Sequence, residues 1–126
     1  HYWYLDECGD VERVQWDDHR VDKKILEFGN VYLTEAEAIK AQQQRLAEVR
    51  VITRLRELDG GFVADWGDEN QSKYCVHFDH AQKGFFIDVW QVCQSCPPHW
   101  TSTKEAWKQV IKEMESDVRL MMGVEV

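Results

Sequence analysis

Residues 32–40 read Tyr32-Leu33-Thr34-Glu35-Ala36-Glu37-Ala38-Ile39-Lys40, and a related stretch returns as Trp100-Thr101-Ser102-Thr103-Lys104-Glu105-Ala106-Trp107-Lys108. Both copies place an aromatic residue, a hydroxyl side chain, Glu, Ala, a bulky apolar residue and Lys in the same order. In each copy a hydroxyl, at Thr34 or Ser102, can cap a helix while the Glu three residues on reaches back to it. The two stretches therefore predict the start of a helix at two places in the chain.

A β-hairpin pattern precedes each predicted helix, because alternating apolar residues flank turn signals. The predicted strands are residues 1–6, 11–16, 74–78 and 85–92. We therefore predict an α+β fold in which one domain, residues 1–126, contains two ββα units, about 1–60 and 61–126. Their strands are expected to form an antiparallel sheet with two long helices packed on one face.

The ends of both helices carry recognisable signals. The first helix is expected to run from the Thr34 cap to Leu58, because Gly60-Gly61 follows as a stop. The second is expected to begin at the Ser102 cap and to end near Gly123, with apolar residues at steps of three and four on one face.

The segment between the first hairpin and the first helix has weaker signals. Asp17-Asp18-His19-Arg20 is polar throughout and is expected to be a loop. Ile25, Leu26 and Phe28 form a short apolar patch, which indicates a third strand or an irregular packed loop.

The last predicted strand is apolar on both sides. We expect Phe85, Ile87 and Val89 to form its outward side, opposite the side that carries Phe86 and Trp90. A strand that is apolar on both sides should be buried on both sides, so this pattern favours self-association, such as a homodimer, or a protein partner. Six Trp, four Tyr and five Phe supply more rings than a helix-covered core needs.

The chain is acidic along its whole length, with a net charge of −8 and a net −4 in each half. Because nucleic-acid binding needs clustered Lys and Arg, direct binding to DNA or RNA is not expected. Carboxylates can instead occupy a basic groove on another protein. The candidate partner-binding residues are Asp17, Asp18, Asp65, Asp68 and Glu69.

Cysteines and histidines in the second half suggest an alternative metal site. Cys93-Gln94-Ser95-Cys96 forms a CxxC motif, and Cys75 and His77 share one side of the partner strand. Zinc takes four such ligands in a tetrahedron. We therefore hold a zinc-stabilised binding domain as an alternative to cysteines that merely pack or form a redox pair, and we expect no other cofactor.

The first helix carries a local concentration of positive charge. Arg50 and Arg54 lie one turn apart on it. One interpretation is that they belong to a solvated, ion-paired face of the helix. The alternative is that they bind an anionic nucleotide signal at an oligomer interface, so that the protein sequesters this small ligand as a sponge.

Motifs of enzymes and membrane proteins are missing from the sequence. It contains no G-x-S-x-G, P-loop, G-x-G-x-x-G or H-E-x-x-H pattern, so we do not expect an enzyme. No leader and no apolar run of transmembrane length is present, so we expect a cytoplasmic protein without a membrane partner.

The layout also carries a family pattern. Aromatic Tyr2-Trp3-Tyr4 precedes Gly9, Val11, Trp16 and Asp22, and the chain then reads Gly29-Asn30-Val31-Tyr32-Leu33-Thr34-Glu35-Ala36-Glu37-Ala38. It resembles small uncharacterised proteins of phages and prophages with the pattern G-N-[VI]-[FY]-x-T-x-E-x-A. This chain departs from the pattern at one position, where Ala36, between two glutamates, stands in place of the glutamate. Lys73-Tyr74, the Ser-capped helix and Gly123-Val124-Glu125 continue the resemblance.

The resemblance implies an anti-defence or inhibitor protein rather than a catalyst. Together with the charge, it leads us to expect a phage protein in the cytoplasm of a bacterial host that binds and inhibits a nucleic-acid-handling or defence protein. A CRISPR effector is one such target, which would make this an anti-CRISPR protein.

Overall fold

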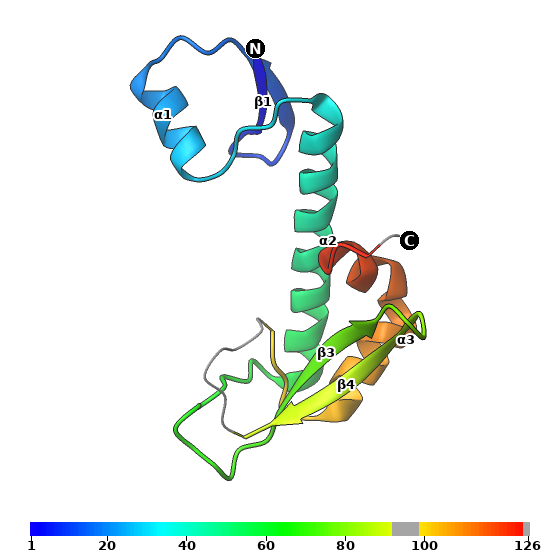
Figure 1. Cartoon of the computed structure of the whole chain (residues 1–126). Helices are drawn as coiled ribbons and strands as arrows, with labels where there is room; N and C mark the ends of the chain where they lie inside the picture. The colour runs from blue at the N-terminus through cyan, green and yellow to red at the C-terminus, as the bar shows by residue number, and fades with distance from the viewer. Residues whose placement is uncertain (92–98, 125–126) are drawn as a thin grey trace. The chain divides into compact units, whose positions relative to one another are not determined.

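The computed structural model describes residues 1–91 and 99–124 and confirms the α+β class (Figure 1). Its elements are β1 (Tyr2–Leu5), β2 (Val11–Val14), α1 (Arg20–Glu27), α2 (Glu35–Asp59), β3 (Lys73–Asp79), β4 (Gly84–Trp90) and α3 (Lys104–Met121). Contacts divide the chain into an N-terminal unit, His1–Leu46, and a C-terminal unit, Ala47–Val126. Helix α2 contributes residues to both.

The described strands form two separate two-stranded antiparallel sheets, β1–β2 and β3–β4, where the sequence had led us to expect one sheet. A single bridge extends each sheet: Trp3 pairs with Tyr32, and Tyr74 pairs with Thr101. In both units the bridging residue lies two positions before the residue that caps the following helix, Thr34 or Thr103. Each hairpin is thus followed by a bridging residue and a capped helix, but in the first half of the chain α1 stands between the hairpin and α2, and the contacts divide the chain after Leu46 rather than near residue 60.

Helix α1 differs from the prediction, because the segment expected as a polar loop followed by a strand or an irregular packed loop is a helix over Arg20–Glu27. Val21 and Ile25 stand four positions apart, which is helical spacing. The Asp22 carboxylate holds the first turn, since its Oδ2 accepts from the backbone N–H groups of Asp17 (3.0 Å) and His19 (3.2 Å). The short length of this amphipathic segment had hidden its period.

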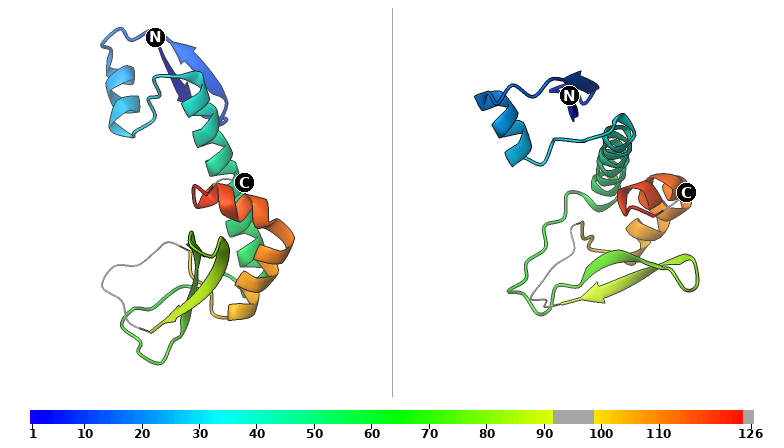
Figure 2. Two further views of the ribbon diagram at one scale, coloured as in Figure 1. Left: turned by 45° about the vertical axis from the view of Figure 1, so that its right-hand side comes forward. Right: turned by 45° about the horizontal axis from the view of Figure 1, so that its top comes forward.

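The N-terminal unit has almost no apolar core. Of its residues, only Tyr2 and Ala38 are buried apolar side chains, and the third buried residue is Asp22. The β1–β2 hairpin and α1 can be followed in two further views (Figure 2).

The C-terminal unit has the main core. Part of α2 and most of α3 cover one face of the β3–β4 hairpin (Figures 1 and 2). The buried members of this core are Val51, Leu55, Val76, Ala106, Trp107, Val110 and Val118.

The side of β4 that we had expected to face outward, from the sequence, is the side that packs on the core. Register pairs Phe78 with Phe85 and Val76 with Ile87, so Phe85 and Ile87 share the covered face of β3 and pack against the core. The opposite side carries Phe86, which is 49 % exposed. Alternation separates the two sides of a strand, but only the pairing with β3 decides which side is covered.

Helix α3 begins one residue later than predicted. Its cap is Thr103, whose Oγ1 accepts from the Ala106 N–H at 3.3 Å, while Ser102 binds Asp59 at the end of α2. At Met114 the backbone leaves helical geometry (φ −137°, ψ 39°) and kinks the helix. Trp107 before the kink and Val118 after it both reach the same core.

A buried lysine fixes the segment that leads into β3. The Lys73 ammonium donates to the carbonyl oxygens of Asp68 (3.0 Å), Gln71 (2.9 Å) and Gln91 (2.7 Å) and lies 5.1 Å from the ring centroid of Trp66. The side chain is fully buried, and three acceptors use all three of its N–H groups.

Candidate binding site

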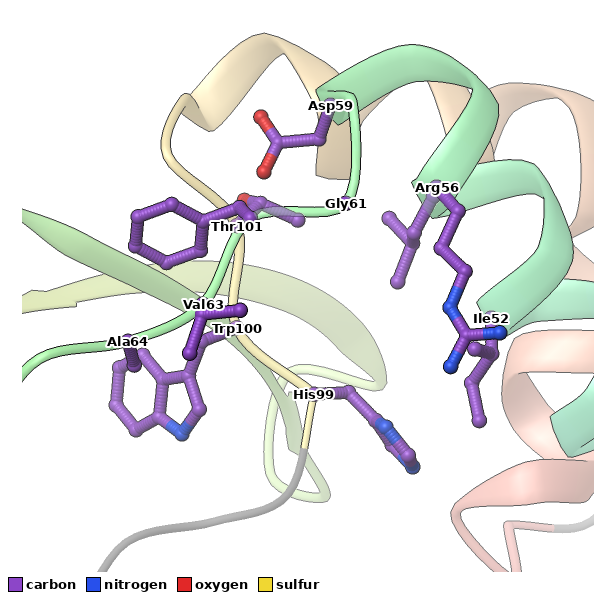
Figure 3. A pocket seen from close by; sticks show the side chains of 11 residues that line it. Ile52, Arg56, Asp59, Gly61, Val63, Ala64, His99, Trp100 and Thr101 are labelled. Carbon is purple, nitrogen blue, oxygen red and sulfur yellow. The ribbon is translucent and has the colours of Figure 1, made fainter.

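A pocket of about 380 Å³ lies at the C-terminal end of α2, within the C-terminal unit (Figure 3). Residues from α2, from the segment after it and from the strand-like segment 99–101 line it. The lining residues are Ile52, Leu55, Arg56, Asp59, Gly61, Phe62, Val63, Ala64, His99, Trp100 and Thr101.

Hydrogen bonds anchor the 99–102 segment that forms one wall. Thr101 exchanges both backbone hydrogen bonds with Tyr74, and Ser102 donates from its backbone N–H (2.8 Å) and its hydroxyl to the Asp59 carboxylate. His99 holds the left-handed conformation (φ 66°), which is rare and costly for a residue with a side chain. The pocket wall is therefore fixed by hydrogen bonds at its Thr101–Ser102 end.

The pocket combines apolar walls with one cation. Figure 3 shows Arg56 and His99 entering from different segments, opposite Val63 and Trp100. Among the described residues no carboxylate pairs with Arg56, whereas Asp59 is occupied by Ser102. The Thr101 hydroxyl donates to the Thr103 carbonyl and makes no nucleophile–base pair. This arrangement can bind a small apolar group.

His99 also lines a second pocket of about 330 Å³. Its Nε2 lies 3.2 Å from Oε1 of Glu48, and the remaining lining residues are Val76, His77, Trp107, Met121 and Met122. No sequence pattern pointed to either pocket, because both depend on the return of the chain beside β3.

The predicted metal ligands are described only in part. Cys75 and His77 do share one side of β3, with Cys75 Sγ 3.4 Å from His77 Nε2, and Cys75 is buried. Cys93 and Cys96 lie outside the described residues. His77 Nε2 is also 3.7 Å from Oδ2 of Asp88. Within residues 1–91 and 99–124, no group of three or more ligand residues is arranged to hold a metal ion.

The two arginines considered for a nucleotide are ion-paired with α3. Arg54 makes a two-pronged contact with Glu113, Nε to Oε2 at 2.8 Å and an amino group to Oε1 at 3.0 Å, and Arg50 binds Asp117 at 2.8 Å. Hydrogen bonds from Arg54 and Gln109 lower the pKa of Glu113 to about 2. Both arginines thus connect α2 to α3.

The predicted partner-binding acids fall in both units. Asp17 and Asp18 are exposed in the loop before α1, and Asp18 lies 3.6 Å from the Lys23 ammonium. In the C-terminal unit, Asp65 accepts from the Gly67 N–H (3.0 Å) and Asp68 from the Asn70 N–H (2.9 Å), so these two carboxylates shape their own loop. Glu69 is exposed beside them.

Large apolar side chains are exposed on the N-terminal unit, which sequence reasoning had missed. Phe28 is 84 % exposed and Leu33 is 77 % exposed, and five further large apolar residues of this unit are also exposed. Those five are Trp16, Val21, Leu26, Ile39 and Leu46. The helical spacing of Val21 and Ile25 was the available signal that this segment is an amphipathic helix.

No family model matches this chain, and neither a curated protein nor a solved structure is significantly similar to it. Among the described helices, none combines the length and the apolar character that crossing a membrane requires.

Proposed function

We propose that this protein is a non-enzymatic phage or prophage protein that docks on a nucleic-acid-handling or defence protein of the bacterial host, such as a CRISPR effector, and inhibits it. The observation that supports this proposal is the N-terminal unit, which buries two apolar side chains and exposes Phe28, Leu33 and several others.

Exposed apolar area of this kind favours association. A unit of 46 residues with so small a core gains little stability by itself. Covering a large apolar side chain with a partner contributes about 1.5–3 kcal/mol. Contiguous exposed apolar surface with a polar rim is typical of protein–protein interfaces.

Charge indicates what kind of partner fits. Residues 1–46 contain ten Asp and Glu side chains against six Lys and Arg, and Asp17 and Asp18 directly precede α1 with its exposed Val21 and Leu26. An apolar patch beside carboxylates complements a basic, partly apolar groove. Grooves that bind nucleic acid have this character, because they neutralise phosphates.

The test uses purified CRISPR effectors and measures guide-directed DNA cleavage as the full-length protein is added. One variant neutralises five carboxylates (Asp17→Asn, Asp18→Asn, Asp65→Asn, Asp68→Asn and Glu69→Gln). Asn keeps the acceptor oxygens that Asp65 and Asp68 supply to their loop, so the fold is preserved while the charge is lost. The control neutralises Glu7, Asp10, Glu12, Glu27 and Glu105 and changes the net charge equally.

We expect the first variant to lose inhibition and the control to keep it. A second pair tests the exposed apolar residues: Phe28→Ser with Leu33→Ser should abolish inhibition, whereas Val49→Ser, at an exposed valine of the C-terminal unit outside the pocket, should not. The absence of inhibition across the panel, or equal loss in both members of a pair, would count against the proposal.

A zinc-stabilised domain is the second candidate, and the Cys75–His77 distance favours it. Tetrahedral zinc with bonds of about 2.3 Å to sulfur and about 2.0 Å to nitrogen separates the two ligand atoms by about 3.5 Å. Cys75 Sγ and His77 Nε2 are 3.4 Å apart. Elemental analysis of the purified full chain tests this: stoichiometric zinc should be lost in Cys75→Ser and kept in Cys8→Ser, and protein without zinc excludes the site.

A further inference from the structure

The outer edge of β4 has no partner strand among the described residues, since β4 pairs only with β3. The strand is seven residues long, contains neither Lys nor Pro, and reads Gly84-Phe85-Phe86-Ile87-Asp88-Val89-Trp90. Long apolar edges of this kind are templates for pairing with another strand.

The direction of the backbone groups along this edge follows from β3. Tyr74 exchanges both of its backbone hydrogen bonds with Thr101, so its N–H and C=O point away from β4. Its partner across the ladder is Val89, and these two therefore form a non-hydrogen-bonded pair. By alternation, the N–H and C=O groups of Phe85, Ile87 and Val89 all point to the outer edge.

One of these outward groups is capped from within β4 itself. The Val89 N–H donates to Oδ1 of Asp88 at 2.9 Å, and Oδ2 of the same carboxylate accepts from the Trp90 indole at 3.0 Å. Among the described residues, no hydrogen bond uses the outward backbone groups of Phe85 and Ile87.

We infer that β4 pairs antiparallel with β4 of a second copy about a two-fold axis at Ile87, which joins the two β3–β4 hairpins into one four-stranded sheet. Only Phe85, Ile87 and Val89 direct their backbone N–H and C=O groups to the outer edge. The hydrogen-bonded pairs of the new ladder must therefore be formed between residues of this set. Centring the pair on Ile87 is the register that overlaps all seven residues. This inference uses a different surface from the proposed function and does not rest on it.

The side chains fit this register. Phe85 lies opposite Val89 of the other copy on the helix-covered face. On the other face Trp90 lies opposite Gly84, where a ring can cover the missing side chain, and Asp88 lies opposite Phe86 rather than another Asp88. The register one step along would place the two Asp88 residues directly opposite, which is unfavourable.

The dimer is expected to be concentration-dependent. A seven-residue edge covers less area than the roughly 1,200 Å² of a stable interface, although exposed Phe86 (49 %) and Val89 (43 %) add apolar contact. Each Val89 N–H must also break its hydrogen bond to Asp88 before it can donate to the other copy across the two-fold axis.

The experiment is sedimentation equilibrium of the full chain over roughly a hundredfold range of concentration. Val89→Pro removes an outward N–H without touching the β3 ladder, so it should raise the dimer dissociation constant by roughly tenfold or more. Val89→Ala, which keeps the N–H, is the matched control and should change it little. Asp88→Ala frees the Val89 N–H and should tighten the dimer.

Two further measurements keep the test decisive if Val89→Pro folds poorly. Val89→Lys should also give a monomer, whereas Val63→Lys should not. The Ile87 amide should be protected from hydrogen exchange only at concentrations where the dimer forms. A native chain that stays monomeric throughout, or a dimer equally stable in Val89→Lys and Val63→Lys, overturns the inference.

Discussion

The hydroxyl of Tyr2 donates a hydrogen bond of 2.6 Å to Oδ1 of Asp22, and both residues are buried. Oδ2 of the same carboxylate accepts from two backbone N–H groups before α1. Burial and the bond to Asp22 raise the pKa of Tyr2 to about 12, and the bond from Tyr2 holds the pKa of Asp22 below its usual range. A polar contact thus takes the place of an apolar core in the N-terminal unit.

Tyr2→Phe should destabilise the N-terminal unit, because Oδ1 of Asp22 loses its donor while remaining buried. Urea unfolding followed by Trp fluorescence would report it, since Trp16 packs edge-on to the Tyr2 ring at 5.8 Å. Tyr4→Phe is the control, because no hydrogen bond of its hydroxyl is observed in this unit. Equal midpoints for the two variants would contradict the role given to Tyr2.

The same contact predicts a loss of stability in alkali. In the unfolded chain Tyr2 gives up its proton near pH 10, whereas in the folded protein it keeps the proton to about pH 12. Its contribution is therefore complete below pH 10 and is lost as the pH rises toward 12. Tyr2→Phe should flatten this part of a plot of urea midpoint against pH.

In acid, protonation of Glu113 should break its ion pair with Arg54 and lower the stability of the protein. The pKa of Glu113 falls from 4.5 to about 2 on folding, so its contribution is complete above pH 4.5 and is lost as the pH falls toward 2. Glu113→Gln should remove this part of the acid dependence of the urea midpoint. Glu115→Gln, on the same helix, should leave it in place.

Lys73→Met should loosen the segment before β3, because three carbonyl oxygens lose their common donor. We expect a cost of about 1–3 kcal/mol and faster amide exchange at residues 65–72. Lys108→Met, at an exposed lysine of α3, is the control. Unchanged exchange in Lys73→Met would show that the segment is held by other contacts.

The cap of α3 can be tested with one substitution. Thr103→Ala should cost about 1 kcal/mol, the usual contribution of a helix N-cap. Thr53→Ala lies inside α2, where the exposed hydroxyl bonds only to the Val49 carbonyl, and should be neutral or slightly stabilising. Thermal unfolding distinguishes the two.

Local signals predicted the elements whose patterns are long. Helix α2 begins after Thr34 and ends before Gly60, as its cap and stop residues indicate, and β3 and the start of β4 lie within a residue of their predicted bounds. Val92, the predicted end of the last strand, lies outside the described residues. The eight residues of α1 were too few for their period to be recognised. Ser102 and Thr103 are both good caps, and only the bond from Ser102 to Asp59 decides between them.

The candidate site was less predictable than the elements. The pocket near Arg56 requires His99 and Trp100 to return beside the end of α2, which no local pattern encodes. The pairing of Arg50 and Arg54 with acids on α3 likewise depends on how two helices pack.

The kink at Met114 divides α3 into two short helical segments, and both pack on the same apolar core. Because the backbone leaves helical geometry there, the turns around Val118 rest on their own contacts, which are the buried Val118 side chain and the ion pair between Asp117 and Arg50. The second segment of α3 is therefore expected to exchange its amide hydrogens at a rate set by these two contacts rather than by the capped first turn.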